Sequence, residues 1–245
     1  GESISKESEA AQARDTYLQM LDRIAAAKVD SNVSVKLTQM GFDISEDLCL
    51  ANMRAILDKA KSLGTFVRLD MESSAYTQRT LDFFANRLYG DYAAHVGVVI
   101  QSCLRRSDKD IDRLIEMKAR VRLCKGAYKE PAEVAWQAKA KVDENYVALM
   151  KILLESGIYH GIATHDPKMI NATIRFARDA GIEQKSFEFQ MLYGIARDRQ
   201  VQLVQNGFNV RVYVPFGRAW YPYFMRRLAE RPANVLFILR ALVKG

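Results

Sequence analysis

Residues 33–37 read VSVKL, an alternation of apolar and polar side chains that predicts a β-strand with two different faces. The apolar residues share one face, which leaves Lys36 on the other face near the carboxyl end of the strand. Six more short runs rich in β-branched and aromatic residues follow along the chain. The predicted strands are Val33–Leu37, Phe66–Met71, Val96–Gln101, Arg120–Cys124, Gly161–Thr164, Phe187–Gln190 and Val210–Val214.

Amphipathic segments separate these strands, and several of them carry helix signals. Ser45 stands before two acidic residues, Asp166-Pro167 places proline at a first helical position, and Gly64 stands where a helix should end. The predicted helices span residues 5–28, 45–63, 74–89, 107–118, 132–156, 166–180, 192–206, 217–230 and 233–243.

Strands that alternate with helices favour a parallel sheet with helical crossovers. Seven strands with at least eight helices, and no Gly-rich dinucleotide turn, are one strand short of a (βα)8 barrel. We therefore predict a single domain over residues 1–245 of the α/β class. The expected architecture is a distorted TIM-like (βα)8 barrel without its first strand, which would lie just before Gly1.

The composition restricts the function classes. The chain has 245 residues, of which 49% are hydrophobic, so it can bury a sizeable core. No window approaches about 18 consecutive apolar residues, and the first fifteen residues are too polar for a signal peptide. Three cysteines without a CxxC pair argue against a disulfide framework or a zinc cluster, so we expect no metal site and a cytoplasmic location.

Charged residues stand on the inward face of three predicted strands. The apolar residues of each strand form one face, which leaves Lys36, Asp70 and Arg122 on the inward face, with Lys36 and Asp70 near the carboxyl end of their strands. Burying a lone charge is costly, so these groups should pair with one another or contact a ligand. Barrel enzymes place their sites at this rim, which favours a ligand site. The alternative is an internal salt-bridge cluster that only stabilises the barrel.

Further polar groups follow strands at the same rim. Gln101 ends the third strand, and Lys125-Gly126-Ala127-Tyr128 follows the fourth, where glycine lets the backbone approach a bulky ligand. Thr164-His165 places an imidazole at the end of the fifth strand, although a lone histidine is as often structural.

The net charge of +7 is concentrated near the C-terminus, since residues 206–245 hold seven basic residues and one acidic residue. Tyr223, Arg226, Arg227 and Glu230 share one face of a predicted helix. Adjacent arginines one turn after a tyrosine favour a clamp for a small carboxylate, whereas a solvated basic face is the simpler alternative. Because the first 205 residues are almost neutral, nucleic acid is not an expected partner.

Six runs in the chain closely resemble the catalytic domain of proline dehydrogenases, in order from end to end. They are SVKLTQMG (34–41), VRLDMES (67–73), VRLCKGAYKEP (121–131), ATHDP (163–167), FEFQMLYGI (187–195) and YVPFGRAWYPYFMRRLAERPAN (213–234). The single-activity bacterial type is the nearest match. The resemblance implies a distorted (βα)8 barrel with non-covalent FAD. It also implies oxidation of L-proline to Δ1-pyrroline-5-carboxylate by hydride transfer, the first step of proline catabolism to glutamate, with electrons passed to membrane quinone.

The resemblance also implies roles for individual residues. Asp70 and Arg122 are expected to be catalytic, with Arg122 at the flavin N5 and O4 edge. Lys36, Arg226 and Arg227 would hold the proline carboxylate, and Glu2 would pair with Arg226 to close the site. The residues expected to surround the pyrrolidine ring are Tyr128, Leu192, Tyr213 and Tyr223. The residues expected to contact FAD are Met71, Gln101, Arg122, Lys125, Gly126, Ala127, Thr164 and His165.

Two points stay open at this stage. A trimmed, inactive (βα)8 scaffold that binds a small carboxylate or phosphate is the alternative to an active flavoenzyme. The quinone step would allow peripheral contact with the inner membrane, and the sequence does not set the oligomeric state.

Overall fold

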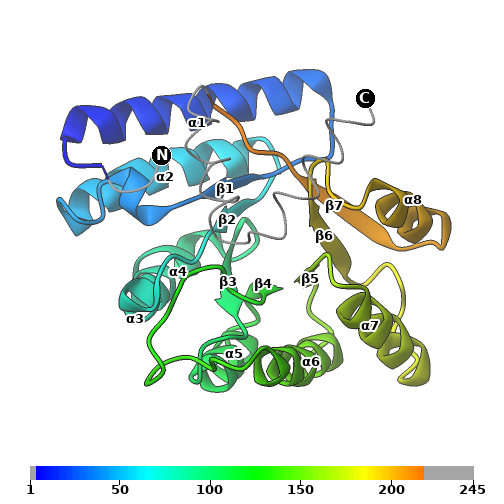
Figure 1. Cartoon of the computed structure of the whole chain (residues 1–245). Helices are drawn as coiled ribbons and strands as arrows, with labels where there is room; N and C mark the ends of the chain where they lie inside the picture. Colours follow the sequence, from blue (N-terminus) through cyan, green and yellow to red (C-terminus); the bar gives the residue numbers. More distant parts are fainter. Residues whose placement is uncertain (1–3, 218–245) are drawn as a thin grey trace, which may run out of the picture.

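The computed structural model describes residues 4–217 and contains one parallel sheet of seven strands. Each strand pairs with the next one along the chain, and the sheet curls into an open barrel with the helices around its outside (Figure 1). This architecture confirms the predicted (βα)8-type fold. The strands are β1 (Val33–Val35), β2 (Val67–Leu69), β3 (Val96–Gln101), β4 (Arg120–Cys124), β5 (Gly161–Ala163), β6 (Glu188–Leu192) and β7 (Asn209–Tyr213).

Helices cover the outer face of the sheet. Ser45 accepts a hydrogen bond from the Leu48 amide at the start of one helix, and Asp166 caps another whose first residue is proline. The α-helices are α1 (Glu7–Ala27), α2 (Glu46–Ser62), α3 (Ser74–Phe83), α4 (Tyr89–Tyr92), α5 (Ser107–Glu116), α6 (Lys139–Glu155), α7 (Pro167–Asp179) and α8 (Arg197–Gln205). The described residues also form a 3-10 helix, η1 (Leu37–Met40), and a π-helix, η2 (Phe84–Leu88).

The hydrophobic core lies between the sheet and these helices. Val35, Leu69, Val121, Leu123 and Phe189 alternate with polar residues along their strands, and all five are fully buried. Each such side chain contributes about 1.5–3 kcal/mol through removal of apolar surface from water. In β1, β2, β4 and β6 the apolar face therefore packs against the helices, and the polar face lines the barrel interior.

The predicted start of the helix at residue 132 was wrong. The amide of Ala135 donates to the Pro131 carbonyl in a turn, and Ala135 then forms an antiparallel bridge with Leu104. The Trp136 amide donates to the Cys103 carbonyl at 2.8 Å. Because residues 135–136 pair with Leu104 and Cys103, they cannot adopt the helical conformation, and α6 begins at Lys139.

Most other boundaries also differ from the predictions by a few residues, and β2, for example, spans only Val67–Leu69 and not Phe66–Met71. The first strand ends at Val35 because the chain turns into η1, and the helix predicted over 74–89 changes to π geometry at Phe84. The helix predicted over 192–206 starts at Arg197, since Leu192 still pairs with Tyr213 in the sheet. The helices predicted over 217–230 and 233–243 lie outside the described residues, apart from residue 217.

Within residues 4–217, no helix combines the length and apolar character that crossing a membrane requires.

The barrel interior has no room for a side chain at Gly97. A Cβ at this position would collide with the backbone carbonyl of Arg120 and lie 2.6 Å from Arg68 Nη1. Gly97→Ala is therefore expected to lower the free energy of unfolding by about 2–3 kcal/mol, because neighbouring strands must separate. Urea unfolding checks this. Gly90→Ala is the control, since a Cβ at Gly90 would meet nothing within 4 Å, and an equal loss in both variants would contradict the prediction.

Candidate active site

A buried ion-pair cluster stands at the carboxyl ends of β1, β2 and β4. Asp70 follows β2 directly, with its Oδ1 2.7 Å from Arg122 Nη1 and its Oδ2 3.3 Å from Lys36 Nζ. Only 13% of the Asp70 side chain and 9% of the Arg122 side chain are exposed. Burial alone would raise the pKa of Asp70, but the two cations outweigh it and the pKa is lowered. The carboxylate therefore stays ionised between its two cations.

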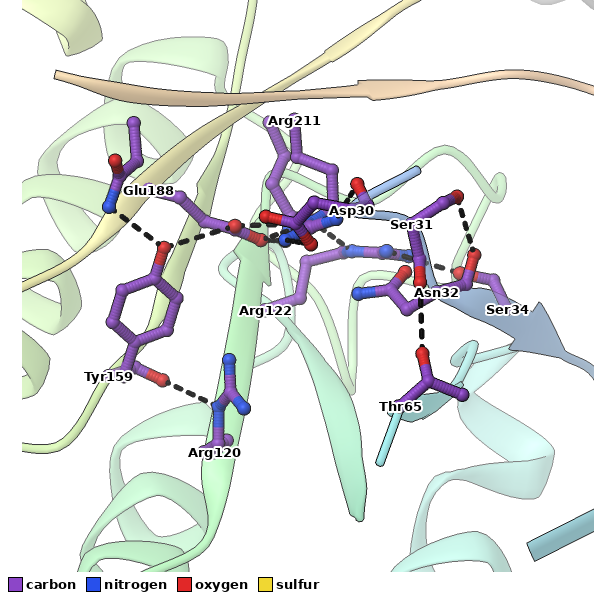
Figure 2. Close-up of polar contacts among 12 residues, drawn as sticks. Asp30, Ser31, Asn32, Ser34, Thr65, Arg120, Arg122, Tyr159, Glu188 and Arg211 are labelled. Carbon is purple, nitrogen blue, oxygen red and sulfur yellow. Dashed lines mark hydrogen bonds and ion pairs between the residues drawn. The ribbon is translucent and has the colours of Figure 1, made fainter. Parts of the chain in front are cut away.

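Arg122 is held on several sides. Its Nε donates to Gln190 Oε1, and its Nη2 donates to Ser34 Oγ at 3.1 Å, a contact visible in Figure 2. The Tyr213 ring lies 5.4 Å from the guanidinium carbon, and the Tyr213 hydroxyl donates to Asp70 at 3.1 Å. The guanidinium plane is thus fixed by side chains from β1, β6 and β7 and by Asp70.

Two of the N–H donors of Arg122 have no acceptor among the described residues. A guanidinium carries five N–H groups, and three of them donate to Gln190, Asp70 and Ser34. No acceptor among residues 4–217 takes the other two. These two donors suit an acceptor that arrives with a ligand.

The loop after β4 is shaped by Gly126. Its φ of +99° lies in the left-handed region, and a Cβ there would collide with the sulfur of Cys103. Neighbouring Lys125 is ion-paired with Asp143 at 2.5 Å and with Asp166 at 2.7 Å. Ala127 and Tyr128 are exposed. The loop therefore presents backbone and a tyrosine, while the Lys125 charge is neutralised by carboxylates.

The other residues predicted at this rim lie on neighbouring strands. Gln101 is buried and donates from Nε2 to the Glu72 carbonyl at 3.3 Å, whereas its Oε1 has no partner in the described part of the chain. His165 Nε2 accepts the Leu192 amide at 2.7 Å. Met71 and Thr164 are buried, and the Thr164 hydroxyl accepts the Asp166 amide. These predicted site residues thus lie at or just after the ends of neighbouring strands.

Four predicted residues, Glu2, Tyr223, Arg226 and Arg227, lie outside the described residues.

Sequence reasoning missed a second charged network deeper in the barrel. The buried Glu188 carboxylate accepts from Arg211 Nε at 2.9 and 3.0 Å and from the Tyr159 hydroxyl at 3.2 Å (Figure 2). Arg211 also donates to the Asp30 carbonyl at 3.2 Å. Burial would raise the pKa of Glu188, but its hydrogen bonds from Arg211 and Gln190 and the charge of Arg211 lower it.

The signal for these residues was present in the alternation of β6. Phe187, Phe189 and Met191 form the buried apolar face, so Glu188 and Gln190 must face the interior, as Lys36 does in β1.

Within the described residues, no group of three or more His, Cys, Asp or Glu side chains is arranged to hold a metal ion.

A comparison with protein families bears on what this rim does. The family model described as proline dehydrogenase matches residues 1–240. The chain belongs to the proline dehydrogenase family. Two relatives of similar likeness are proline dehydrogenase 2 of Bacillus subtilis (strain 168), 43% identical over 244 residues, and the proline dehydrogenase of Deinococcus radiodurans, 43% identical over 249 residues. Each match covers the whole of this chain and 80% of the relative.

Solved structures extend the likeness to the fold. The proline dehydrogenase family chain superposes with a TM-score of 0.84 on proline utilization A from Bdellovibrio bacteriovorus, inactivated by N-propargylglycine. The match covers 93% of this chain at 29% identity. The chain spans 29% of that longer structure.

Asp70→Asn tests the ion-pair cluster of this proline dehydrogenase family member. Removing the charge leaves Lys36 and Arg122 without a counter-ion, so the free energy of unfolding at pH 7 is expected to fall by about 2–4 kcal/mol. Because the folded-state pKa of Asp70 is lowered, its stabilisation is present above about pH 4 and is lost as the pH falls through the folded-state pKa. The difference between wild type and variant should therefore narrow below about pH 4. Urea unfolding of wild type and variant at pH 7 and below about pH 4 measures this difference in stability. A difference that does not change with pH would refute the assignment.

Proposed function

We propose that the chain is an FAD-dependent flavoenzyme that oxidises L-proline to Δ1-pyrroline-5-carboxylate by hydride transfer. The observation that carries the proposal is the buried Lys36–Asp70–Arg122 cluster at the carboxyl-end rim of a proline dehydrogenase family barrel. The rim supplies fixed cations in a poorly solvated setting, which is what an anionic substrate and a flavin that gains negative charge both require.

The residues at this rim fit a flavin. The buried Gln101 Oε1 lacks a partner in the described part of the chain, so it can accept from a ring N–H group. The two remaining Arg122 N–H groups can donate to carbonyl and ring-nitrogen acceptors. Gly126 has no side chain, so the backbone of the loop after β4 can approach a ligand. Met71, Lys125, Ala127, Thr164 and His165 complete the proposed flavin-binding set. Bound FAD supplies the hydride acceptor of the reaction.

The protein side chains are proposed to position proline. Lys36, with Arg226 and Arg227, would hold the substrate carboxylate through charge-assisted hydrogen bonds. Tyr128, Leu192, Tyr213 and Tyr223 would pack around the ring and exclude water. Asp70 holds Lys36 and Arg122 in place and keeps the cluster from carrying two uncompensated charges.

Proton transfer and closure are part of the same proposal. No strong base stands beside the Asp70 cluster within residues 4–217, so water is proposed to take the proton from the proline nitrogen before hydride transfer. Glu2 is proposed to pair with Arg226 as a gate over the bound substrate. Electrons would then pass to membrane quinone, with peripheral contact at the inner membrane.

The test is the visible spectrum of the purified protein, followed by addition of L-proline without oxygen. Flavin absorption that bleaches on addition is the expected result. A protein that binds FAD but is not bleached retains a cofactor site without substrate chemistry. A protein that stays colourless with added FAD is the inactive scaffold, and either result rejects the proposed activity.

Arg122→Lys separates charge from geometry at the proposed flavin partner. Lysine keeps the positive charge but cannot supply the planar set of donors, so the rate of flavin reduction by L-proline is expected to fall about 100-fold. Anaerobic stopped-flow absorbance measures this rate. Arg113→Lys is the matched control, because Arg113 on α5 forms a half-exposed ion pair with Asp82 on α3. A comparable loss in this variant would count against a specific role for Arg122.

A further inference from the structure

A continuous chain of charged and amide groups runs through the barrel interior to Arg122. Arg211 on β7 holds the Glu188 carboxylate with its Nε, and Glu188 Oε1 accepts from Gln190 Nε2 at 2.5 Å. Gln190 Oε1 then accepts from Arg122 Nε. Glu188 and Gln190 are 3% and 5% exposed, so the bond between them and the bond from Arg122 to Gln190 are made away from bulk water.

The direction of this chain follows from the chemistry of its members. An ionised carboxylate only accepts hydrogen bonds, so Glu188 draws the NH2 group of Gln190 toward itself. This turns the carbonyl oxygen of the same amide toward Arg122. Because Arg211 keeps Glu188 ionised, the amide is held in the one orientation that can receive the Arg122 Nε–H.

Gly161 makes room for this amide. The three atoms nearest to a Cβ at Gly161 would be the Nε2, Cδ and Oε1 of Gln190, of which Cδ lies at 2.7 Å and Oε1 at 3.2 Å. All three belong to one side chain, and no backbone atom is among them. The backbone at Gly161 is ordinary strand that any residue can adopt, so the preference for glycine comes from the space that the Gln190 amide occupies.

We propose that Gly161 and Gln190 are positioning residues that fix the guanidinium plane of Arg122, an inference that rests on the proposed function. Asp70 and Ser34 hold the Nη groups of Arg122, and Gln190 alone among the described residues holds its Nε. Without that third contact, the guanidinium can rotate about the line through its two Nη partners. Its two remaining N–H donors would then no longer point to a fixed place. Lys36 is bound to Asp70 Oδ2 and does not depend on Gln190.

Gly161→Ala displaces the amide without removing a polar group, and Gln190→Ala removes it. Each variant is expected to slow flavin reduction by saturating L-proline about 10- to 100-fold. The L-proline concentration that gives half the maximal rate should change less than about threefold, since carboxylate binding is assigned to other residues. The midpoint potential of bound FAD should become more negative, because the reduced flavin loses an aligned cation.

The double variant Gly161→Ala/Gln190→Ala tests whether the two positions act through the same group. If Gly161→Ala acts only by displacing the Gln190 amide, it adds nothing in the Gln190→Ala background, and the two effects are not additive. Gly90→Ala is the matched control, with nothing within 4 Å of the added Cβ, and should match wild type in rate and potential.

Three outcomes decide the inference. Variants with the expected rate, potential and non-additivity support it. Folded single variants with wild-type rate and potential overturn it, as does a full additional loss from Gly161→Ala in the double variant. The proposed function fails separately, when L-proline does not reduce wild-type flavin; the midpoint potentials, measured by chemical titration, then still report on the positioning of Arg122.

Discussion

The structure depends on one constraint, the need to compensate charges that the barrel buries. A parallel barrel commits the apolar face of every strand to the surrounding helices, so its interior receives whatever stands on the other face. Here that face carries arginines, carboxylates and amides. The observed solution is pairing, with Asp70 between Lys36 and Arg122 near the carboxyl ends and Glu188 against Arg211 deeper in the barrel.

Arg68 shows the same constraint solved with backbone. Its Nη1 donates to the carbonyls of Arg120 and Val98 at 2.6 and 3.2 Å, and its guanidinium carbon lies 4.8 Å from the Phe66 ring centroid. Such an arrangement requires an empty inner face on the adjacent strand, which Gly97 provides. The glycines of the interior thus set where long polar side chains can lie across the barrel.

These pairings also connect stability to the proposed chemistry. The buried charges of the cluster compensate one another, so their positions are fixed before a ligand binds. The side chains then need to move little during the reaction. Lys36 and Arg122 lower the pKa of Asp70, and the same two cations are proposed to face substrate and flavin. Folding and the proposed binding therefore depend on the same side chains.

The sequence by itself determined the order of elements, the barrel class and the inward direction of Lys36, Asp70 and Arg122, because alternation along a strand is a local property. It also placed Gln101 at the end of a strand, and Gly126 and His165 in the segments that follow strands. It misplaced the starts of α6 and α8, since pairing of residues 135–136 with the chain near Cys103, and of Leu192 with Tyr213, is contact between distant segments. Only the tertiary structure decided which interior groups bind one another. Residues 122 and 190 are far apart in the chain and meet because the sheet curls, which no local pattern encodes.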